Sequence, residues 1–231
     1  MSGKVTTGEL RDGQPFDVRY LTFADLSIIM QLQKKVENAL LSNATLEPLS
    51  KEEFTEILSE HQFMIGVFVD EKMIAFRAMR LPEMDGEHLG IDAGLSDEEL
   101  SKVIYQEIST IDPDYRGNGL QNYMGKLFMN RLDSKRFRYV CATVAPFNIP
   151  SIKDKLELGL EVVALKRKYG GKLRYIFMKD LADSRSERVF NEEVSLKMSE
   201  IEKQQNLLHS GFLGISIKEV QEEWYVNYCR I

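Results

Sequence analysis

The residues with the clearest chemical use form a glycine-containing loop near the middle of the chain: Arg116, Gly117, Asn118, Gly119, Leu120 and Gln121. The loop follows an alternating, strand-like run that ends at Ile111 and precedes apolar residues at helical spacing. A helix N-terminus exposes unpaired backbone N–H groups and a partial positive charge, which together favour an anion. Glycines there let a phosphate approach the backbone, because no Cβ atom stands in the way. The pattern therefore predicts a phosphate-binding loop, with a simple strand-to-helix turn as the alternative.

Two common phosphate-binding motifs fit this loop poorly. A P-loop has four residues between its first glycine and a Gly-Lys pair that Ser or Thr follows. Here five residues separate Gly119 from Gly125 and Lys126, and Leu127 comes next, so the P-loop is excluded. A dinucleotide-binding fingerprint needs a third glycine where Asn122 stands, and it belongs after the first strand of a βαβ unit.

A third motif fits better and rests on a family resemblance. The segment from Arg116 to Leu120 resembles the acyl-CoA loop of the GNAT N-acetyltransferase superfamily, R/Q-x-x-G-x-G/A, although Gln121 replaces its small last residue. A second segment, from Asn148 through Ser151 to Gly159, resembles the superfamily's N-x-x-A/S…G-F element. The order of the expected strands and helices also agrees, so the resemblance covers roughly residues 16–181.

The resemblance implies acetyl-CoA as the cofactor, no metal, and direct transfer of the acetyl group to the amine of a small molecule, amino acid, peptide or protein. It also implies that the cofactor contacts the loop, the strand before the loop and the downstream segment. The residues implied to bind acetyl-CoA are Ser109, Ile111, Arg116, Gly117, Asn118, Gly119, Leu120, Gln121, Asn148 and Ser151.

The catalytic candidates, Glu107 and Tyr105, follow from the same resemblance, because pantetheine in this family lies along the strand before the loop. Four residues separate Glu107 from Ile111, a distance of about 13 Å at ~3.3 Å per residue. A partly buried carboxylate at Glu107 would have a raised pKa that suits a general base. The alternative is a polar residue that is satisfied by hydrogen bonds or faces water.

The general acid is harder to assign from the sequence. Lys155 stands where many relatives have a proton-donating Tyr, and a lysine there either orients a phosphate or points to solvent. Tyr123 and Tyr169 are the remaining candidates for this role. This departure keeps two hypotheses open beside N-acetyl transfer: a non-catalytic acyl-CoA-binding or regulatory module, and an interaction protein that acts through its C-terminal segment.

The elements that must position these residues predict an α+β fold, with a mixed, mostly antiparallel central sheet flanked by helices and a small C-terminal α+β appendage. Residues 1–15 read as a loose lead-in, 16–181 as the GNAT-like domain and 182–231 as the appendage. Expected strands cover 17–21, 63–69, 73–80, 103–111, 139–144, 160–169, 174–179, 189–196, 212–217 and 224–230. Expected helices cover 25–41, 50–59, 119–132, 151–158 and 201–209.

The composition narrows the class of partner. The 231 residues are 43% hydrophobic and 29% charged, with a formal net charge of −6. An acidic chain is poorly suited to neutralising phosphates, so we expect no nucleic acid, and no apolar stretch is long enough to span a membrane. The 2 cysteines make no disulfide framework, which favours a cytoplasmic location, and the 3 histidines lack metal-ligand spacing. The run from Trp224 to Tyr228 either pairs with a second copy, giving a homodimer, or packs on the core.

Overall fold

The computed structural model describes residues 3–39, 47–183 and 192–230. The chain divides into two compact units. The first, called the loop unit here, comprises Met1–Leu81 and Gln106–Arg131; the second, called the C-terminal unit, comprises Pro82–Tyr105 and Leu132–Ile231. Strand β5 begins in the C-terminal unit and ends in the loop unit.

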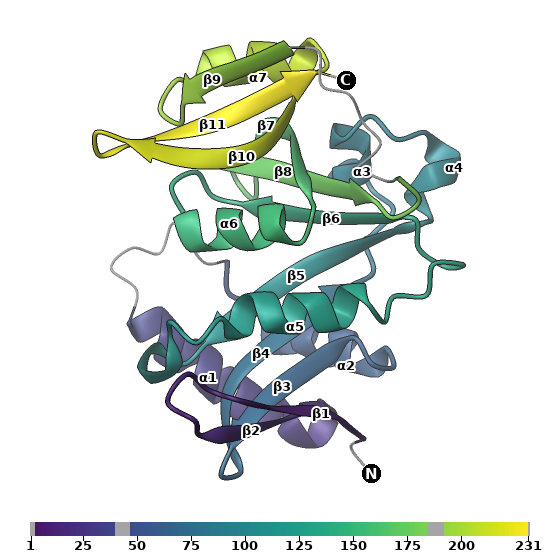
Figure 1. Ribbon diagram of the computed structural model, residues 1–231. Helices are drawn as coiled ribbons and strands as arrows, with labels where there is room; N and C mark the ends of the chain where they lie inside the picture. The colour runs from purple at the N-terminus through teal and green to yellow at the C-terminus, as the bar shows by residue number, and fades with distance from the viewer. Residues whose placement is uncertain (1–2, 40–46, 184–191, 231) are drawn as a thin grey trace. The chain divides into compact units, whose positions relative to one another are not determined.

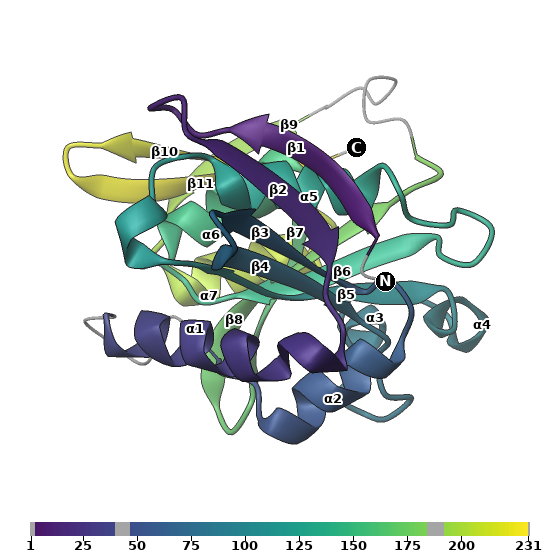
Figure 2. The same cartoon turned by 90° about the horizontal axis from the view of Figure 1, so that it is seen from below.

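The strands of the loop unit lie in the order β1-β2-β3-β4-β5. The pairs β1–β2, β2–β3 and β3–β4 are antiparallel. The unit contains β1 (Lys4–Glu9), β2 (Pro15–Tyr20), the 3-10 turn η1 (Phe23–Asp25), α1 (Leu26–Asn38), α2 (Lys51–Ser59), β3 (Met64–Val69), β4 (Lys72–Arg80), the end of β5 (Val103–Ile111), the 3-10 turn η2 (Pro113–Tyr115) and α5 (Leu120–Met129). Figures 1 and 2 show α1 and α2 on one face of these strands and α5 on the other.

Local sequence explains the helices of the loop unit. Ser50 caps α2 by accepting from the backbone N–H of Glu53, whose carboxylate accepts in return from the backbone N–H of Ser50. Ser50 and Glu53 have the Ser-x-x-Glu spacing of such a reciprocal capping box. In α1, Ile29, Leu32 and Val36 form the buried stripe that packs toward β4.

The N-terminal segment departs from the sequence prediction. Residues 4–9, expected to belong to a loose lead-in, form strand β1, which pairs with β2 from Lys4↔Arg19 to Glu9↔Pro15. The β-formers Val5, Thr6 and Thr7 and a turn at Gly13 give the physical reason. The backbone N–H of Arg11, in the turn of this hairpin, donates to Asn118 of the glycine loop.

The strands of the C-terminal unit lie in the order β5-β6-β8-β7-β10-β11-β9. β5 and β6 are parallel, from Val103↔Tyr139 to Tyr105↔Cys141, and the pairs that follow are antiparallel. The unit contains α3 (Leu89–Asp92), α4 (Asp97–Leu100), the start of β5, β6 (Tyr139–Val144), α6 (Ile149–Glu157), β7 (Glu161–Lys168), β8 (Lys172–Asp180), β9 (Glu192–Lys197), α7 (Ile201–His209), β10 (Leu213–Val220) and β11 (Glu223–Arg230). The mixed, mostly antiparallel sheet with flanking helices confirms the predicted fold class.

The C-terminal α+β segment continues the sheet of its unit, since β10 pairs with β7 at Gly214↔Val162. Gln204, fully buried on α7, accepts hydrogen bonds from the hydroxyls of Tyr175 and Tyr228 and donates to the carbonyl oxygen of Met198. The residues around Trp224 therefore pack within the unit, with Tyr228 buried. The linker expected at residues 182–186 lies outside the described residues from residue 184 onward, as does the start of the strand expected at 189–196. No helix of the described residues is long and apolar enough to cross a membrane.

Candidate functional site

The glycine loop leaves β5 at Ile111 and enters α5 at Leu120. Gly117 (φ +83°) and Gly119 (φ +72°) both adopt left-handed backbone conformations, which explains why glycine stands at each position. A Cβ atom built on either glycine would meet no atom within 4 Å. Packing within the protein therefore does not exclude a side chain there, and the backbone of both residues faces open space.

The start of α5 is suited to an anion. Gly119 is the N-cap residue, and no side chain caps the helix. Backbone N–H groups of a first helical turn lack intrahelical partners, so an uncapped start offers them to a ligand. Arg116, just before the glycines, is exposed and adds a positive charge at the mouth of the loop.

A buried carboxylate fixes the entry to the loop. Asp112, at 1% side-chain exposure, accepts from the backbone N–H of Asp114 at 3.1 Å and from Nζ of Lys35 at 2.6 Å. The ammonium of Lys72 lies 3.3 Å from its other oxygen. Burial by itself would raise the pKa of Asp112, but these partners outweigh burial and hold the pKa below its usual value. The carboxylate therefore stays ionised and anchors the turn η2.

Asn118 braces the loop from inside. Its Nδ2 donates to the carbonyl oxygen of Tyr115 at 3.0 Å, and its Oδ1 accepts from the backbone N–H of Arg11 at 3.0 Å. The amide side chain is therefore used in fastening the loop to the β1–β2 hairpin. Because the side chain is used in this way, the backbone of Asn118 is the part left to make the predicted contact with the cofactor.

Sequence reasoning missed a cation beneath the loop. Arg77 on β4 is 1% exposed, and its guanidinium donates to the carbonyl oxygen of Gln121 at 2.9 Å and to Oε1 of Gln106 at 2.5 Å. A fixed positive charge thus supports the first turn of α5 from the core side. The available signal was a single Arg inside the otherwise apolar run 73–79.

Strand β5 carries the predicted polar face. Glu107, Ser109 and Ile111 are partly exposed, whereas the alternate residues Ile108 and Thr110 are buried, as the alternation predicts. The Oγ atom of Ser109 is shielded from solvent and has no hydrogen-bond partner within the described part of the chain. Buried hydroxyls normally have partners, so an unpaired one is unusual on this face of β5.

Glu107 has the electrostatics of a base. Its side chain is 20% exposed and lies beside Arg80, with Nη1 of Arg80 3.7 Å from Oε1 of Glu107. Burial raises the pKa of Glu107 above its usual value, and the guanidinium of Arg80 offsets this only in part. A carboxylate with a raised pKa accepts a proton more readily near neutral pH.

Tyr105, the other catalytic candidate, belongs to the C-terminal unit. Its hydroxyl accepts from the backbone N–H of Leu89 at 2.6 Å, and its ring packs on His88 with 5.7 Å between centroids. These contacts hold helix α3 in place. The catalytic role of Tyr105 stays a prediction.

The second predicted cofactor segment also lies in the C-terminal unit. Asn148 is the N-cap of α6, and its Oδ1 accepts from the backbone N–H of Ser151 at 3.4 Å. Lys155 is buried and pairs with Asp154 at 3.0 Å, so it does not point to solvent. The structure describes this segment and the glycine loop as parts of different units, and cofactor binding by Asn148 and Ser151 stays a prediction.

The two tyrosines considered as proton donors have separate surroundings. Tyr123 on α5 donates to the carbonyl oxygen of Thr7 at 3.3 Å. Tyr169, in the C-terminal unit, is 46% exposed with φ +50°, and its hydroxyl lies 3.2 Å from Oγ1 of Thr143. Tyr123 is thus tied to the N-terminal hairpin, whereas Tyr169 is open to solvent.

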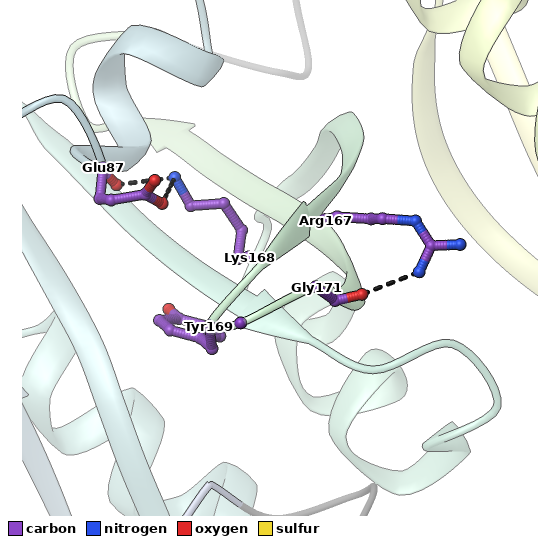
Figure 3. Close-up of a pocket in the computed structure, with 6 residues that line it drawn as sticks. Glu87, Arg167, Lys168, Tyr169 and Gly171 are labelled. Atoms are coloured by element: carbon purple, nitrogen blue, oxygen red, sulfur yellow. Dashed lines mark hydrogen bonds and ion pairs between the residues drawn. The ribbon is translucent and has the colours of Figure 1, made fainter.

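A pocket of about 400 Å³ lies at the β7–β8 turn, lined by Glu87, Arg167, Lys168, Tyr169, Gly170 and Gly171 (Figure 3). Nζ of Lys168 is 2.7 Å from a carboxylate oxygen of Glu87 and 3.0 Å from one of Asp92, although Lys168 is only 6% exposed. These ion pairs join the α3 region to β7. Tyr169, one of the two tyrosines considered as proton donors, lines this pocket.

The remaining titratable candidates are structural or exposed. Cys141 is fully buried, and burial raises the pKa of its thiol to about 12, which suits a core residue and not a nucleophile. His61 and His209 are exposed, whereas His88 is 1% exposed and burial lowers its pKa. Within the described ranges, no three His, Cys, Asp or Glu side chains are grouped to hold a metal ion.

The fold of this chain is similar to that of several solved proteins. No family model and no curated protein matches the sequence. The solved ribosomal-protein-S18-alanine N-acetyltransferase from Escherichia coli aligns with a TM-score of 0.54 at 15% identity, over 76% of this chain and 99% of the enzyme. The GNAT domain of PAT from S. lividans aligns with a TM-score of 0.54 at 18% identity, over 76% of this chain and 96% of that domain. The chain has the GNAT fold.

Another GNAT-fold neighbour, yncA from Salmonella typhimurium, was solved with its cofactor acetyl-CoA. It aligns with a TM-score of 0.53 at 14% identity, over 74% of this chain and 96% of its own. These alignments confirm the fold that the resemblance implied. At these identities the likeness establishes the fold, and the reaction has to be argued from the residues of this chain.

Proposed function

We propose that this GNAT-fold protein binds acetyl-CoA through residues 116–121 and transfers the acetyl group directly to an amine. The observation that carries the proposal is the loop itself. Gly117 and Gly119 turn in left-handed conformations into a helix that no side chain caps, and open space lies over both glycines. That arrangement fits a pyrophosphate bound by backbone N–H groups.

The residues present fit the cofactor in two further respects. Arg116 is an exposed cation beside the loop. The Oγ of Ser109, which has no hydrogen-bond partner among the described residues, lies two residues from the end of β5. When bound, acetyl-CoA supplies the acetyl group as an activated thioester. In this proposal the backbone of the loop and Arg116 hold the phosphates, while Ser109 donates to or accepts from the pantetheine arm.

Glu107 is proposed as the general base. An amine acceptor is protonated near neutral pH and becomes nucleophilic only after it loses a proton. The N–H bond of the ammonium breaks and an O–H bond forms on Glu107, directly or through one water molecule. Its raised pKa brings the carboxylate closer to the range in which a general base works best. Lys155 is buried against Asp154, so we propose that the thiolate is protonated by solvent.

One observation favours a second function, a non-catalytic acyl-CoA-binding module. The buried Lys155–Asp154 pair occupies the position at which the sequence resemblance implies a proton-donating Tyr. In that case the cofactor site is kept while chemistry is lost. The two functions differ in turnover and agree in cofactor binding.

The experiment measures both properties on the full chain. Isothermal titration with CoA and acetyl-CoA tests the loop, and release of free thiol from acetyl-CoA is then measured with a panel of alkyl amines, amino acids, peptides and lysine-containing proteins. Saturable binding with amine-dependent thiol release supports the proposal. Binding without release on any acceptor favours the second function, and absence of CoA binding contradicts both.

A further inference from the structure

Arg80 is shared by three carboxylates in the loop unit. It is the last residue of β4, and its side chain is 16% exposed. Its guanidinium nitrogens lie 3.2 Å from Oε1 of Glu53, 2.9 Å from Oε2 of Glu56 and 3.7 Å from Oε1 of Glu107. The cluster therefore joins the end of β4, the helix α2 and the candidate base on β5, and its charge balance is negative.

The charge on each carboxylate affects the proton affinity of the other two, because all three lie near the guanidinium of Arg80. Glu53 is fixed by the capping box, since its other oxygen accepts from the backbone N–H of Ser50 at 2.8 Å. Glu56 is the most exposed of the three, at 56%. The carboxylates of Glu53 and Glu56 repel a negative charge on Glu107, whereas Arg80 attracts it. Changing any one of these groups must change how strongly Glu107 holds a proton.

We propose that Arg80, divided between Glu107 and the α2 residues Glu53 and Glu56, is a positioning residue that orients Glu107 and governs how readily it takes up a proton. The inference rests on the proposed function, because it takes Glu107 as the base. Its physical basis is that opposing effects on the ionisation of Glu107 meet at one site. Burial and two neighbouring carboxylates favour the neutral acid, and one guanidinium favours the ionised form.

Sharing Arg80 among three carboxylates sets how strongly the proposed base binds a proton. Without Arg80, a largely buried Glu107 near two further carboxylates would hold its proton more strongly. With Arg80 bound by Glu107 alone, the carboxylate would be a weaker base. Sharing the guanidinium with α2 keeps the proton affinity between these limits, so α2 tunes the base without contacting the reacting atoms.

The test measures the proton affinity of Glu107 directly, in the full chain without cofactor. The ¹³C resonance of its carboxyl carbon is assigned by its loss in Glu107→Gln and is titrated from acid to neutral pH. We expect Arg80→Gln to raise the pKa of Glu107, because the attracting cation is gone. We expect Glu56→Gln to lower it, because a repelling charge is gone. Opposite shifts are the signature of a shared cation.

Glu52→Gln is the matched control, because Glu52 lies on the same helix α2, is exposed and is not a partner of this cluster. It should leave the pKa of Glu107 unchanged. Arg80→Lys keeps the charge and should shift the pKa less than Arg80→Gln. If Arg80→Gln does not fold, Glu56→Gln decides by itself, because Glu56 is largely exposed and its neutral substitute preserves shape.

A second readout separates this inference from the proposed function. Where wild-type turnover is found, the acidic limb of the kcat/KM profile should move to higher pH in Arg80→Gln and to lower pH in Glu56→Gln. An unmoved pKa of Glu107 in both variants overturns the inference while leaving CoA binding and turnover intact. Opposite pKa shifts in a protein that neither binds nor turns over CoA support the cluster and contradict the proposed function.

Discussion

The ammonium of Lys35 lies 2.6 Å from a carboxylate that is almost fully buried, Asp112, and also 2.6 Å from one that is exposed, Asp114. One lysine on α1 thus meets both acidic residues at the entry to the glycine loop. Asp112 also accepts a hydrogen bond from the backbone N–H of Asp114, so the buried carboxylate is the one that fixes the turn. The loop is held from the helix α1 as well as from its own strand.

Asp112→Asn should therefore destabilise the protein and weaken CoA binding. A buried hydrogen bond to a charged group contributes about 1–3 kcal/mol, and we expect a loss of unfolding free energy in that range. Urea unfolding followed by far-ultraviolet circular dichroism measures the loss, and titration calorimetry measures affinity for CoA. Asp114→Asn is the control, because its carboxylate is exposed and its pair with Lys35 contributes little. Equal effects of the two substitutions would contradict this assignment.

Gly119→Trp should abolish CoA binding by filling the space over the loop. The left-handed backbone costs a non-glycine residue about 1–2 kcal/mol, so some destabilisation is expected for any substitution here. Gly211→Trp is the matched control: Gly211 has φ +85°, is exposed and has no atom within 4 Å of a built Cβ. Both variants should lose similar stability, and only Gly119→Trp should lose affinity. Retained binding in Gly119→Trp would refute the loop as the phosphate site.

Acid should destabilise the loop unit through three carboxylates. Burial opposes ionisation of Asp25, Glu53 and Asp112, but their hydrogen bonds and ion pairs outweigh it, and each pKa lies below its usual value of 3.8 for Asp or 4.5 for Glu. A depressed pKa contributes stability above the unfolded-state pKa, and that contribution is lost as pH falls through the folded-state value. Urea midpoints should therefore fall between about pH 5 and pH 2.

The same series in Asp112→Asn should show a shallower fall, because one of the three contributors is absent. Glu107 acts with the opposite sign, since its pKa is raised and its ionisation costs stability as pH rises. A variant with an unchanged slope would show that Asp112 is not among the groups that respond to acid.

Local patterns predicted the elements that position the site. The bounds of β5, β6 and α7 agree with the sequence residue for residue, because alternation in a strand and spacing in a helix are properties of neighbours in the chain. The start of α6 lies two residues earlier than expected, because Asn148 caps the helix and Pro150 is accommodated in its first turn. Strand β1 was missed because its only evident signal was a short run of β-formers.

The contacts that support the site could not be predicted from the sequence. Arg77 supports the helix at Gln121 from 44 positions away, and Asn118 meets Arg11 across 107 positions. Such pairs depend on how strands pair and on which face each side chain takes. The predicted role of Glu107 came from the family resemblance, whereas its partnership with Arg80 depends on β4 and β5 lying side by side in the sheet. Family motifs identified the loop, and tertiary structure supplied what holds it.

Ser109→Ala should weaken CoA binding without harming the fold. The side-chain oxygens of Ser109 (Oγ) and Thr110 (Oγ1) are both buried, and neither has a hydrogen-bond partner among the residues that the structure describes. A hydroxyl buried in this way costs free energy in the unliganded protein, so its removal should be neutral or stabilising by up to about 1 kcal/mol. The two residues are adjacent on β5 and point to opposite faces.

Thr110→Val is therefore the control for Ser109→Ala, since it removes the same group from the core face of the same strand. Both variants should keep the urea midpoint or raise it slightly. Only Ser109→Ala should lose affinity for CoA, by roughly fivefold if one hydrogen bond of about 1 kcal/mol is lost. S-acetylpantetheine should show the same ratio between the variants, because the contact is with the pantetheine arm. Equal CoA affinities of the two variants would remove Ser109 from the cofactor site and leave the loop alone as its anchor.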